Sequence, residues 1–170
     1  VMLMGGLSVI FIMSILSFIY FFFIAIFIFV VLYTVVSYTF ESISIMAMSK
    51  SIGYKNSGFA WIPFYNKYFL GKIAGNNVIG IISAILTFIS FFLGVYFYIY
   101  KELGNVLFII LIISLIVGFI LDTVVAHKLY KSSTYKYSDI LTIFTVLSLG
   151  LLRPLFLFII RNKPIKSIEE

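Results

Sequence analysis

Long apolar runs, rather than alternating positions, dominate the pattern of hydrophobic and polar residues along this chain. Four segments are mostly apolar: residues 7–33, 78–100, 106–121 and 140–160. Runs of about 18 or more apolar residues are typical of membrane-spanning helices, whereas strands of a membrane barrel would alternate polar with apolar side chains. The pattern therefore predicts an all-α, polytopic integral membrane protein with about four transmembrane helices.

The stretches between these runs divide the chain into elements of a single membrane domain, residues 1–170. The first helix covers about 7–36 and continues to about 51, because no Pro or Gly stops it before Gly53. The remaining predicted elements are an interfacial elbow at 59–74, helices at 78–100, 106–126 and 140–160, and a tail at 161–170.

Composition also indicates a chain dissolved in lipid. Hydrophobic residues make up 63% of it and charged residues only 11%, whereas soluble domains carry about 25% charged residues. The chain has no cysteine and a single histidine, His127. It therefore lacks disulfides and thiolate ligands, and it has too few imidazoles for a typical zinc site. We expect neither a metal nor another cofactor.

The placement of lysine and arginine predicts the orientation in the membrane. Four lysines lie in the 37–77 connection and three in the 127–139 connection, whereas Lys101 in the short hairpin is balanced by Glu102. The two basic connections are expected on the cytoplasmic side, with the N-terminus outside. The charge of +6 predicts contact with anionic lipid headgroups and not with nucleic acid. The bias of the composition toward residues such as Ile, Phe and Tyr indicates an AT-rich bacterial genome, and the expected location of the chain is therefore a bacterial cytoplasmic membrane.

The 140–160 segment allows two topologies. A complete crossing would place the basic residues of the 161–170 tail outside, against the charge bias. Gly150 and the pair Arg153–Pro154 would instead let the segment enter, turn and return as a re-entrant element, provided that its turn is buried in protein. Both topologies are compatible with the sequence.

The stretch GFAWIPFYNKYFLG, residues 58–71, gathers amphipathic side chains between two apolar runs. Trp and Tyr rings favour the headgroup level, a lysine can extend toward water, and a proline suits the first turn of a short helix. We therefore predict an interfacial helix or shallow elbow, and a ligand or partner site is the alternative. The predicted membrane anchors are Trp61, Pro63, Tyr65, Asn66, Lys67 and Tyr68.

Residues 50–75, KSIGYKNSGFAWIPFYNKYFLGKIAG, resemble a segment of a family of small, uncharacterised bacterial polytopic membrane proteins. In that family a loop with Lys and Gly leads into an AWIP-x-x-N-x-Y-x-L-x-x-I-A element, which corresponds here to Ala60 through Ala74. Residues 154–163, PLFLFIIRNK, are similar to the family's closing segment. The resemblance implies the membrane architecture but no activity, because the family has no established one.

Small residues recur at spacings of three and four on two of the predicted helices. Lipid gives helices no hydrophobic reason to associate, so such faces serve to let backbones approach closely. The predicted packing residues are Gly80, Ala84, Thr87 and Gly94 in the 78–100 helix and Ser114 and Gly118 in the 106–126 helix.

Asp122 and Arg153 are ionisable residues inside apolar runs, which makes them candidates for an intramembrane polar site. With a rise of about 1.5 Å per residue, Asp122 lies about 7 Å and Arg153 about 21 Å from the cytoplasmic boundary if the 140–160 helix is straight. A straight helix therefore disfavours a direct ion pair, and a re-entrant segment favours one. The alternatives are pairing of Asp122 with Lys128 or an interhelical hydroxyl, and a boundary anchor for Arg153.

No set of side chains typical of a catalytic site is visible, so we do not expect an enzyme. The leading hypothesis is a non-catalytic accessory, assembly or immunity-type subunit of a larger bacterial membrane complex, which associates with other membrane subunits or with itself. The alternative is a small transporter or channel component in which Asp122 lines a polar path.

Overall fold

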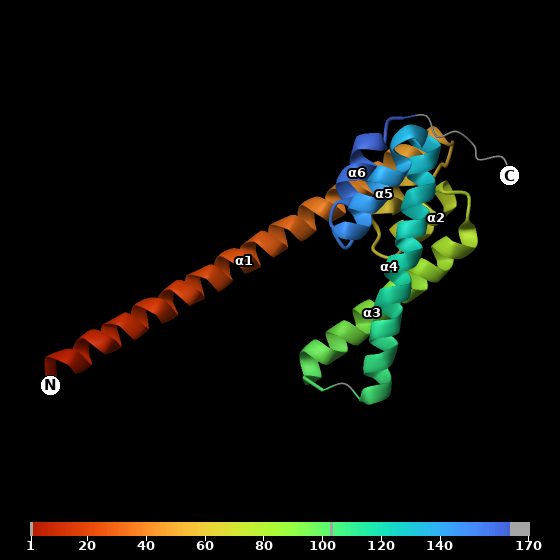
Figure 1. The fold of residues 1–170 in the computed structure, drawn as a ribbon. Coiled ribbons are helices and arrows are strands. Elements are labelled where there is room, and N and C mark those ends of the chain that lie inside the picture. Colours follow the sequence, from red (N-terminus) through yellow and green to blue (C-terminus); the bar gives the residue numbers. More distant parts are fainter. Residues whose placement is uncertain (1, 103, 164–170) are drawn as a thin grey trace. The chain divides into compact units, whose positions relative to one another are not determined.

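The computed structural model describes residues 2–102 and 104–163, and every regular element in them is helical (Figure 1). This confirms the predicted all-α class for the described part of the chain. The long helices are α1 (Met2–Ser51), α3 (Asn77–Tyr100) and α4 (Asn105–Ser133). The short helices are α2 (Tyr65–Ile73), α5 (Ser138–Leu147) and α6 (Arg153–Ile160), with two 3-10 turns, η1 (Ser57–Trp61) and η2 (Tyr135–Tyr137).

Three helices in the described residues are long and apolar enough to cross a membrane: α1 from Ile10 onward, α3 and α4. The 24 residues of α3 and the 29 of α4 correspond to about 36 and 44 Å of helix, and a hydrocarbon core is about 30 Å thick. These helices are compatible with a multi-pass membrane protein. A fourth spanning helix is not confirmed.

The chain divides into two units, residues 1–38 and 39–170. In the first unit, all side chains of residues 10–32 are exposed. The hydroxyl of Thr34 bonds to the helix's own backbone, since its Oγ1 donates to Val30 O at 2.8 Å. This part of α1 therefore presents an apolar surface: its backbone groups pair within the continuous helix, and the Thr34 hydroxyl also finds its acceptor there.

The core of the second unit gathers around the C-terminal half of α4. Four helices contribute buried apolar side chains to it: α1, α2, α4 and α6. The principal members are Ile45, Met48, Leu70, Ile73, Val125, Ala126, Leu129, Tyr130, Leu157 and Ile160. Covering this half of α4 with three other helices produces an interior in which polar groups can be shielded from both water and lipid.

Gly71 and Gly80 hold α2 directly against α3. A Cβ at Gly71 would lie 2.3 Å from Gly80 Cα, and a Cβ at Gly80 would lie 2.7 Å from a backbone oxygen of α2. Only glycine fits this approach. Gly75, with φ of 76°, ends the connection from α2, and Asn76 caps α3 by accepting a hydrogen bond from Ile79 N at 3.1 Å.

The predicted elbow consists of η1 and α2, joined by a turn at Pro63 and Phe64. Phe64 has a φ of 68°, and Tyr65 N donates to Pro63 O at 2.8 Å. This is a γ-turn with positive φ, which is strained for a bulky residue. The Phe64 ring packs against Phe88 and Phe91 of α3, with centroids 5.4 and 5.6 Å away, and these contacts help to hold the turn.

The helix predicted at 140–160 is divided into α5 and α6. Between them Leu149 and Gly150 adopt left-handed backbone conformations, with φ of 51° and 83°. A left-handed residue ends a helix. Pro154 then lies at the start of α6, where its fixed φ suits a first turn. Of the two forms that the sequence left open for residues 140–160, the straight, continuous helix is therefore not found.

The chain reverses its direction along α4 at this break. Gly150 lies beside Phe119 of α4, since a Cβ there would be 3.4 Å from the Phe119 ring. Phe156 of α6 lies near Tyr130, with ring centroids 6.2 Å apart. From Gly150 to Phe156 the chain therefore runs along α4 in the direction from Phe119 to Tyr130, toward the C-terminal end of α4. The preceding helix, α5, begins close to that end and leads to Gly150.

Candidate functional site

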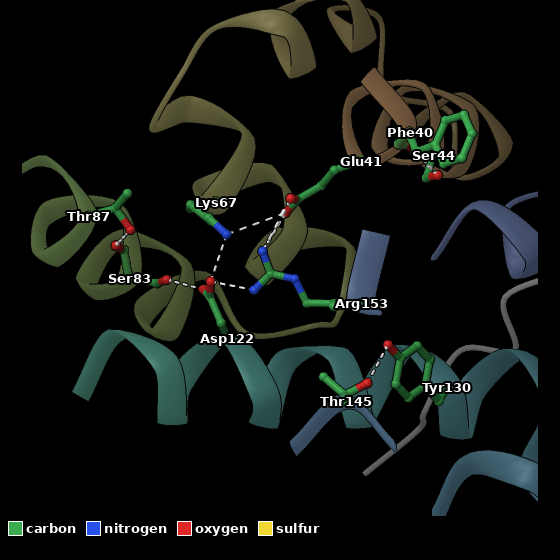
Figure 2. Close-up of polar contacts among 10 residues, drawn as sticks. All are labelled: Phe40, Glu41, Ser44, Lys67, Ser83, Thr87, Asp122, Tyr130, Thr145 and Arg153. Carbon is green, nitrogen blue, oxygen red and sulfur yellow. Dashed lines mark hydrogen bonds and ion pairs between the residues drawn. The ribbon is translucent and has the colours of Figure 1, made fainter. Parts of the chain in front are cut away.

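Four charged side chains from four helices meet in the second unit: Glu41 of α1, Lys67 of α2, Asp122 of α4 and Arg153 of α6 (Figure 2). We call them the four-charge cluster. Their side chains are between 8% and 15% exposed. Two positive and two negative charges cancel, so the cluster as a whole is neutral.

Each cation of the cluster contacts both carboxylates. Lys67 Nζ lies 2.6 Å from Asp122 Oδ2 and 3.4 Å from Glu41 Oε1. Arg153 Nη1 lies 2.5 Å from Asp122 Oδ2, and Arg153 Nη2 lies 3.0 and 3.2 Å from the two oxygens of Glu41. Each buried carboxylate is therefore neutralised by two cations at once.

A serine of α3 completes the contacts of Asp122. Ser83 Oγ donates to Asp122 Oδ1 at 2.6 Å, so both oxygens of this carboxylate accept hydrogen bonds (Figure 2). Ser83 O in turn accepts from Thr87 Oγ1 at 2.8 Å. Arg153 Nε has no hydrogen-bond partner within the described residues. Together these contacts connect five helices.

Burial makes the balance of the cluster energetically critical. Removing an ion from water costs several kcal/mol, and short ion pairs with completed hydrogen bonds offset that cost. In α6, outside the three candidate spans, burial works against the charged guanidinium. The carboxylates of Glu41 and Asp122 outweigh this effect and hold the pKa of Arg153 above its ordinary value. Loss of any one member would leave an uncompensated charge in the interior.

Local backbone features direct the two cations inward. Arg153 is the first residue of α6, so the reversal of the chain sets its position. The turn at Phe64 starts α2 and places Lys67 in the first turn of that helix. The contact between Gly71 and Gly80 then brings α2 against α3, whose Ser83 also reaches Asp122.

The structure brings together the two residues predicted as an intramembrane polar site. On a straight helix, depths of about 7 and 21 Å would keep Asp122 and Arg153 apart. The reversal at Gly150 returns Arg153 to the level of Asp122, and the two side chains pair directly. Ser83 provides an interhelical hydroxyl of the predicted kind, whereas Lys128 forms none of the ion pairs found among the described residues.

The predicted membrane anchors fall into two groups. Those at the surface are Trp61, Pro63, Tyr65 and, half-buried, Tyr68. Asn66, in contrast, is only 4% exposed, and Lys67 belongs to the four-charge cluster. The expectation that these two side chains face headgroups or water is therefore wrong. The two buried acids provide Lys67 with charged partners that a local amphipathic pattern does not reveal.

The predicted packing residues are all buried or half-buried: Gly80, Ala84, Thr87, Gly94, Ser114 and Gly118. Ser114 Oγ shares a hydrogen bond of 2.8 Å with Ser90 Oγ across the α3–α4 interface, and a Cβ at Gly118 would lie 3.9 Å from Leu86 Cβ. Gly94 differs, because a Cβ there would meet nothing within 4 Å in the described residues. Gly94 is therefore not at a close contact among the described residues, and its predicted role in helix packing stays a prediction.

Glu41 is the member of the cluster that the sequence did not point to. It lies in the extension of the first helix, where hydrophobicity falls and an exposed acid is ordinary. Its side chain is nevertheless buried against Lys67 and Arg153. A single acid in a segment that otherwise carries small and apolar residues, ESISIMAMS, is the local signal that was available.

The fold and the cluster define an α-helical protein with three candidate membrane spans and a neutral buried ion network. Comparison with protein-family models, with curated proteins and with solved structures gives no match to this chain. The resemblance of residues 50–75 and 154–163 to a family of small bacterial membrane proteins therefore stays a prediction.

Proposed function

We propose that this protein is a non-catalytic integral protein of the bacterial cytoplasmic membrane that acts as an accessory, assembly or immunity-type subunit of a larger membrane complex. The observation that carries the proposal is the closed, neutral four-charge cluster. Its contacts tie α1, α2, α4 and α6 to one another. Such a network fixes the arrangement of helices and leaves their apolar outer faces to lipid or to other subunits.

The chemistry of the cluster favours this structural role over catalysis. Both acids are held by two cations each, and Ser83 is only 2% exposed, so neither a free base nor an accessible nucleophile is present among these residues. Within residues 2–102 and 104–163, no three His, Asp or Glu side chains are placed to hold a metal ion.

In the proposed topology, α5 and α6 form a re-entrant hairpin that enters and leaves through the cytoplasmic face. Their 10 and 8 residues correspond to about 15 and 12 Å of helix, too short to cross about 30 Å of hydrocarbon. The reversal at Gly150 supports the return. It also keeps Arg161 and Lys163 on the same side as the basic 127–139 connection, which agrees with the charge bias.

Because the chain has no cysteine, single cysteines can test this topology. Membrane-impermeant thiol reagents should label Lys136→Cys and Lys163→Cys only from the cytoplasmic side and Lys101→Cys only from the opposite side. Labelling of Lys163→Cys from the outside would show a complete crossing and end the re-entrant proposal.

The accessory role is tested by mild-detergent purification from the native membrane. We expect a complex of fixed stoichiometry with another membrane protein or with a second copy of this chain, which the Arg153→Leu variant fails to form. A well-folded wild-type monomer without any such partner would contradict the proposal.

A second candidate, a transport or permeation component, rests on hydroxyls that follow Asp122 along the α3–α4 interface: Ser83, Thr87, Ser90 and Ser114. This polar line ends at Ser90, with ten residues of α3 still to come, or about 15 Å. If the chain conducts, Asp122→Asn should abolish flux into liposomes, whereas Asp139→Asn should not. Absence of wild-type flux for any ion tested would retire this candidate.

A further inference from the structure

Because the four-charge cluster is neutral, the net positive charge of the chain comes from side chains outside it. Of the four acids in the described residues, Glu41 and Asp122 are consumed by Lys67 and Arg153. The remaining two acids, Glu102 and Asp139, are outnumbered by the lysines that lie outside the cluster. The chain's net charge of +6 therefore belongs to side chains outside the buried network.

Three of these lysines lie in two segments that meet at Tyr54: the turn that ends α1, in which Gly53 N donates to Lys50 O and Tyr54 N to Ser49 O, and the last turn of α2. Lys50 lies in the last turn of α1, Lys55 directly follows Tyr54, and Lys72 lies in the last turn of α2. Lys72 Nζ is 4.4 Å from the centre of the Tyr54 ring and 5.9 Å from that of Tyr68. We call Lys50, Lys55 and Lys72 with Tyr54 the Tyr54 lysine cluster.

This cluster is open and unbalanced, unlike the buried one. Lys50 and Lys55 are exposed and Lys72 is half-exposed, and none of the ion pairs among the described residues involves them. The contact with the Tyr54 ring restrains Lys72 while its ammonium N–H groups stay able to donate. Restraint before binding lowers the entropy cost of holding an anion.

We propose that the Tyr54 lysine cluster binds the phosphate of an anionic phospholipid headgroup. The proposal rests on the membrane location given above, and it names the lipid chemistry and the residues involved. Trp61 and Tyr65 lie exposed on the segment that follows, as expected where the protein surface meets the headgroups. The apolar surfaces of the neighbouring helices can accept the acyl chains, which a free phosphate does not have.

The test compares the triple variant Lys50→Gln/Lys55→Gln/Lys72→Gln with Lys101→Gln. Lys101 is a matched control because it also lies over a tyrosine ring, Tyr98, at 5.4 Å, in the hairpin between α3 and α4. Wild type and variants are purified from membranes that contain phosphatidylglycerol and phosphatidylethanolamine, and bound lipid is counted by native mass spectrometry. Soluble glycerol phosphate is added in a parallel arm.

Each lysine near an anionic surface contributes about 1 kcal/mol, which corresponds to about fivefold in affinity. The triple variant should therefore lose the preferential retention of phosphatidylglycerol by about a hundredfold, and Lys101→Gln should keep it. Equal retention in wild type and triple variant, equal loss in Lys101→Gln, or full displacement by glycerol phosphate would each overturn the proposal. Failure of the wild-type chain to insert into membranes at all would instead overturn the proposed membrane function.

Discussion

The two ends of the α3–α4 hairpin differ in their side chains and in how far these are buried. At one end Ser83 of α3 and Asp122 of α4 belong to a buried polar network, and Gly80 touches the backbone of α2. At the other end, beyond the Ser90–Ser114 hydrogen bond, the large apolar side chains are mostly exposed: Phe91, Phe92, Tyr96, Phe97, Tyr98, Ile99, Tyr100, Val106, Phe108 and Ile109.

The difference concerns the solvent on which each end depends. The exposed end has little protein around it, so its rings and aliphatic side chains need lipid or another subunit to cover them. The network end has its own interior, in which ion pairs among the four charged side chains replace their contacts with water. Specific side-chain interactions within the chain should therefore dominate stability at the network end, while the surroundings of the chain should dominate at the exposed end.

The largest effect is expected when one charge is removed from the four-charge cluster. Arg153→Leu leaves Glu41 and Asp122 with Lys67 as their single cation, so a negative charge stays buried without compensation. Breaking a buried ion pair in this way costs about 3–5 kcal/mol. The loss should be measured as a change in the free energy of unfolding, by titrating the purified protein in mild detergent with a denaturing detergent.

Two variants control for the loss of side-chain volume and of charge as such. Lys163→Leu removes an exposed cation and should change the free energy of unfolding by less than about 0.5 kcal/mol. The double variant Glu41→Leu/Arg153→Leu restores neutrality with Lys67 and Asp122 and should recover part of the loss. A single Arg153→Leu variant as stable as wild type would show that the network is not what stabilises this end.

The helices themselves could be predicted from the sequence because a long apolar run needs no tertiary information. The break near Gly150 and Pro154 was also indicated, because left-handed backbone and a fixed φ are properties of single residues. The direction that the chain takes after the break was not indicated. The break alone does not tell whether the chain goes on or returns, and it does not reveal that Arg153 then pairs with Glu41, 112 positions away.

Glu41 and Lys67 show why half of the site escaped prediction. Both lie in segments where polar residues are expected at a membrane surface, and their local patterns fit exposed side chains. Inside the protein Lys67 pairs with Glu41 and Asp122 over separations of 26 and 55 positions, and Glu41 also pairs with Arg153 over 112 positions. Asp122 was found because a charge inside an apolar run is costly wherever it goes, and that criterion needs no partner.

A smaller effect is expected from the glycines that distinguish the two ends. Gly71→Ala places a Cβ 2.3 Å from Gly80 Cα, so α2 must move away from α3 and carry Lys67 with it. Forcing extra volume into a packed contact costs about 1–3 kcal/mol. The same unfolding titration measures this loss.

Gly94→Ala is the matched substitution at the exposed end. A Cβ there meets nothing within 4 Å in the described residues, and alanine favours a helix over glycine by about 0.5–1 kcal/mol. This variant should be unchanged or slightly more stable. Equal destabilisation by Gly71→Ala and Gly94→Ala would mean that α3 is packed as tightly at its exposed end, and the contrast between the ends would disappear.

The smallest effect is expected at the boundary between the ends, where Ser90 and Ser114 meet at 2.8 Å. Ser114→Ala should cost about 0.6 kcal/mol, a common value for interhelical hydrogen bonds in membranes. The loss is small because Ser90 Oγ also donates to Leu86 O at 2.8 Å and so keeps a partner. A double-mutant cycle with Ser90→Ala measures the coupling directly. A coupling indistinguishable from zero would move the boundary back to Ser83 and Asp122. The interior built by the chain itself would then end at the charged residues, and the rest of the hairpin would depend on its surroundings.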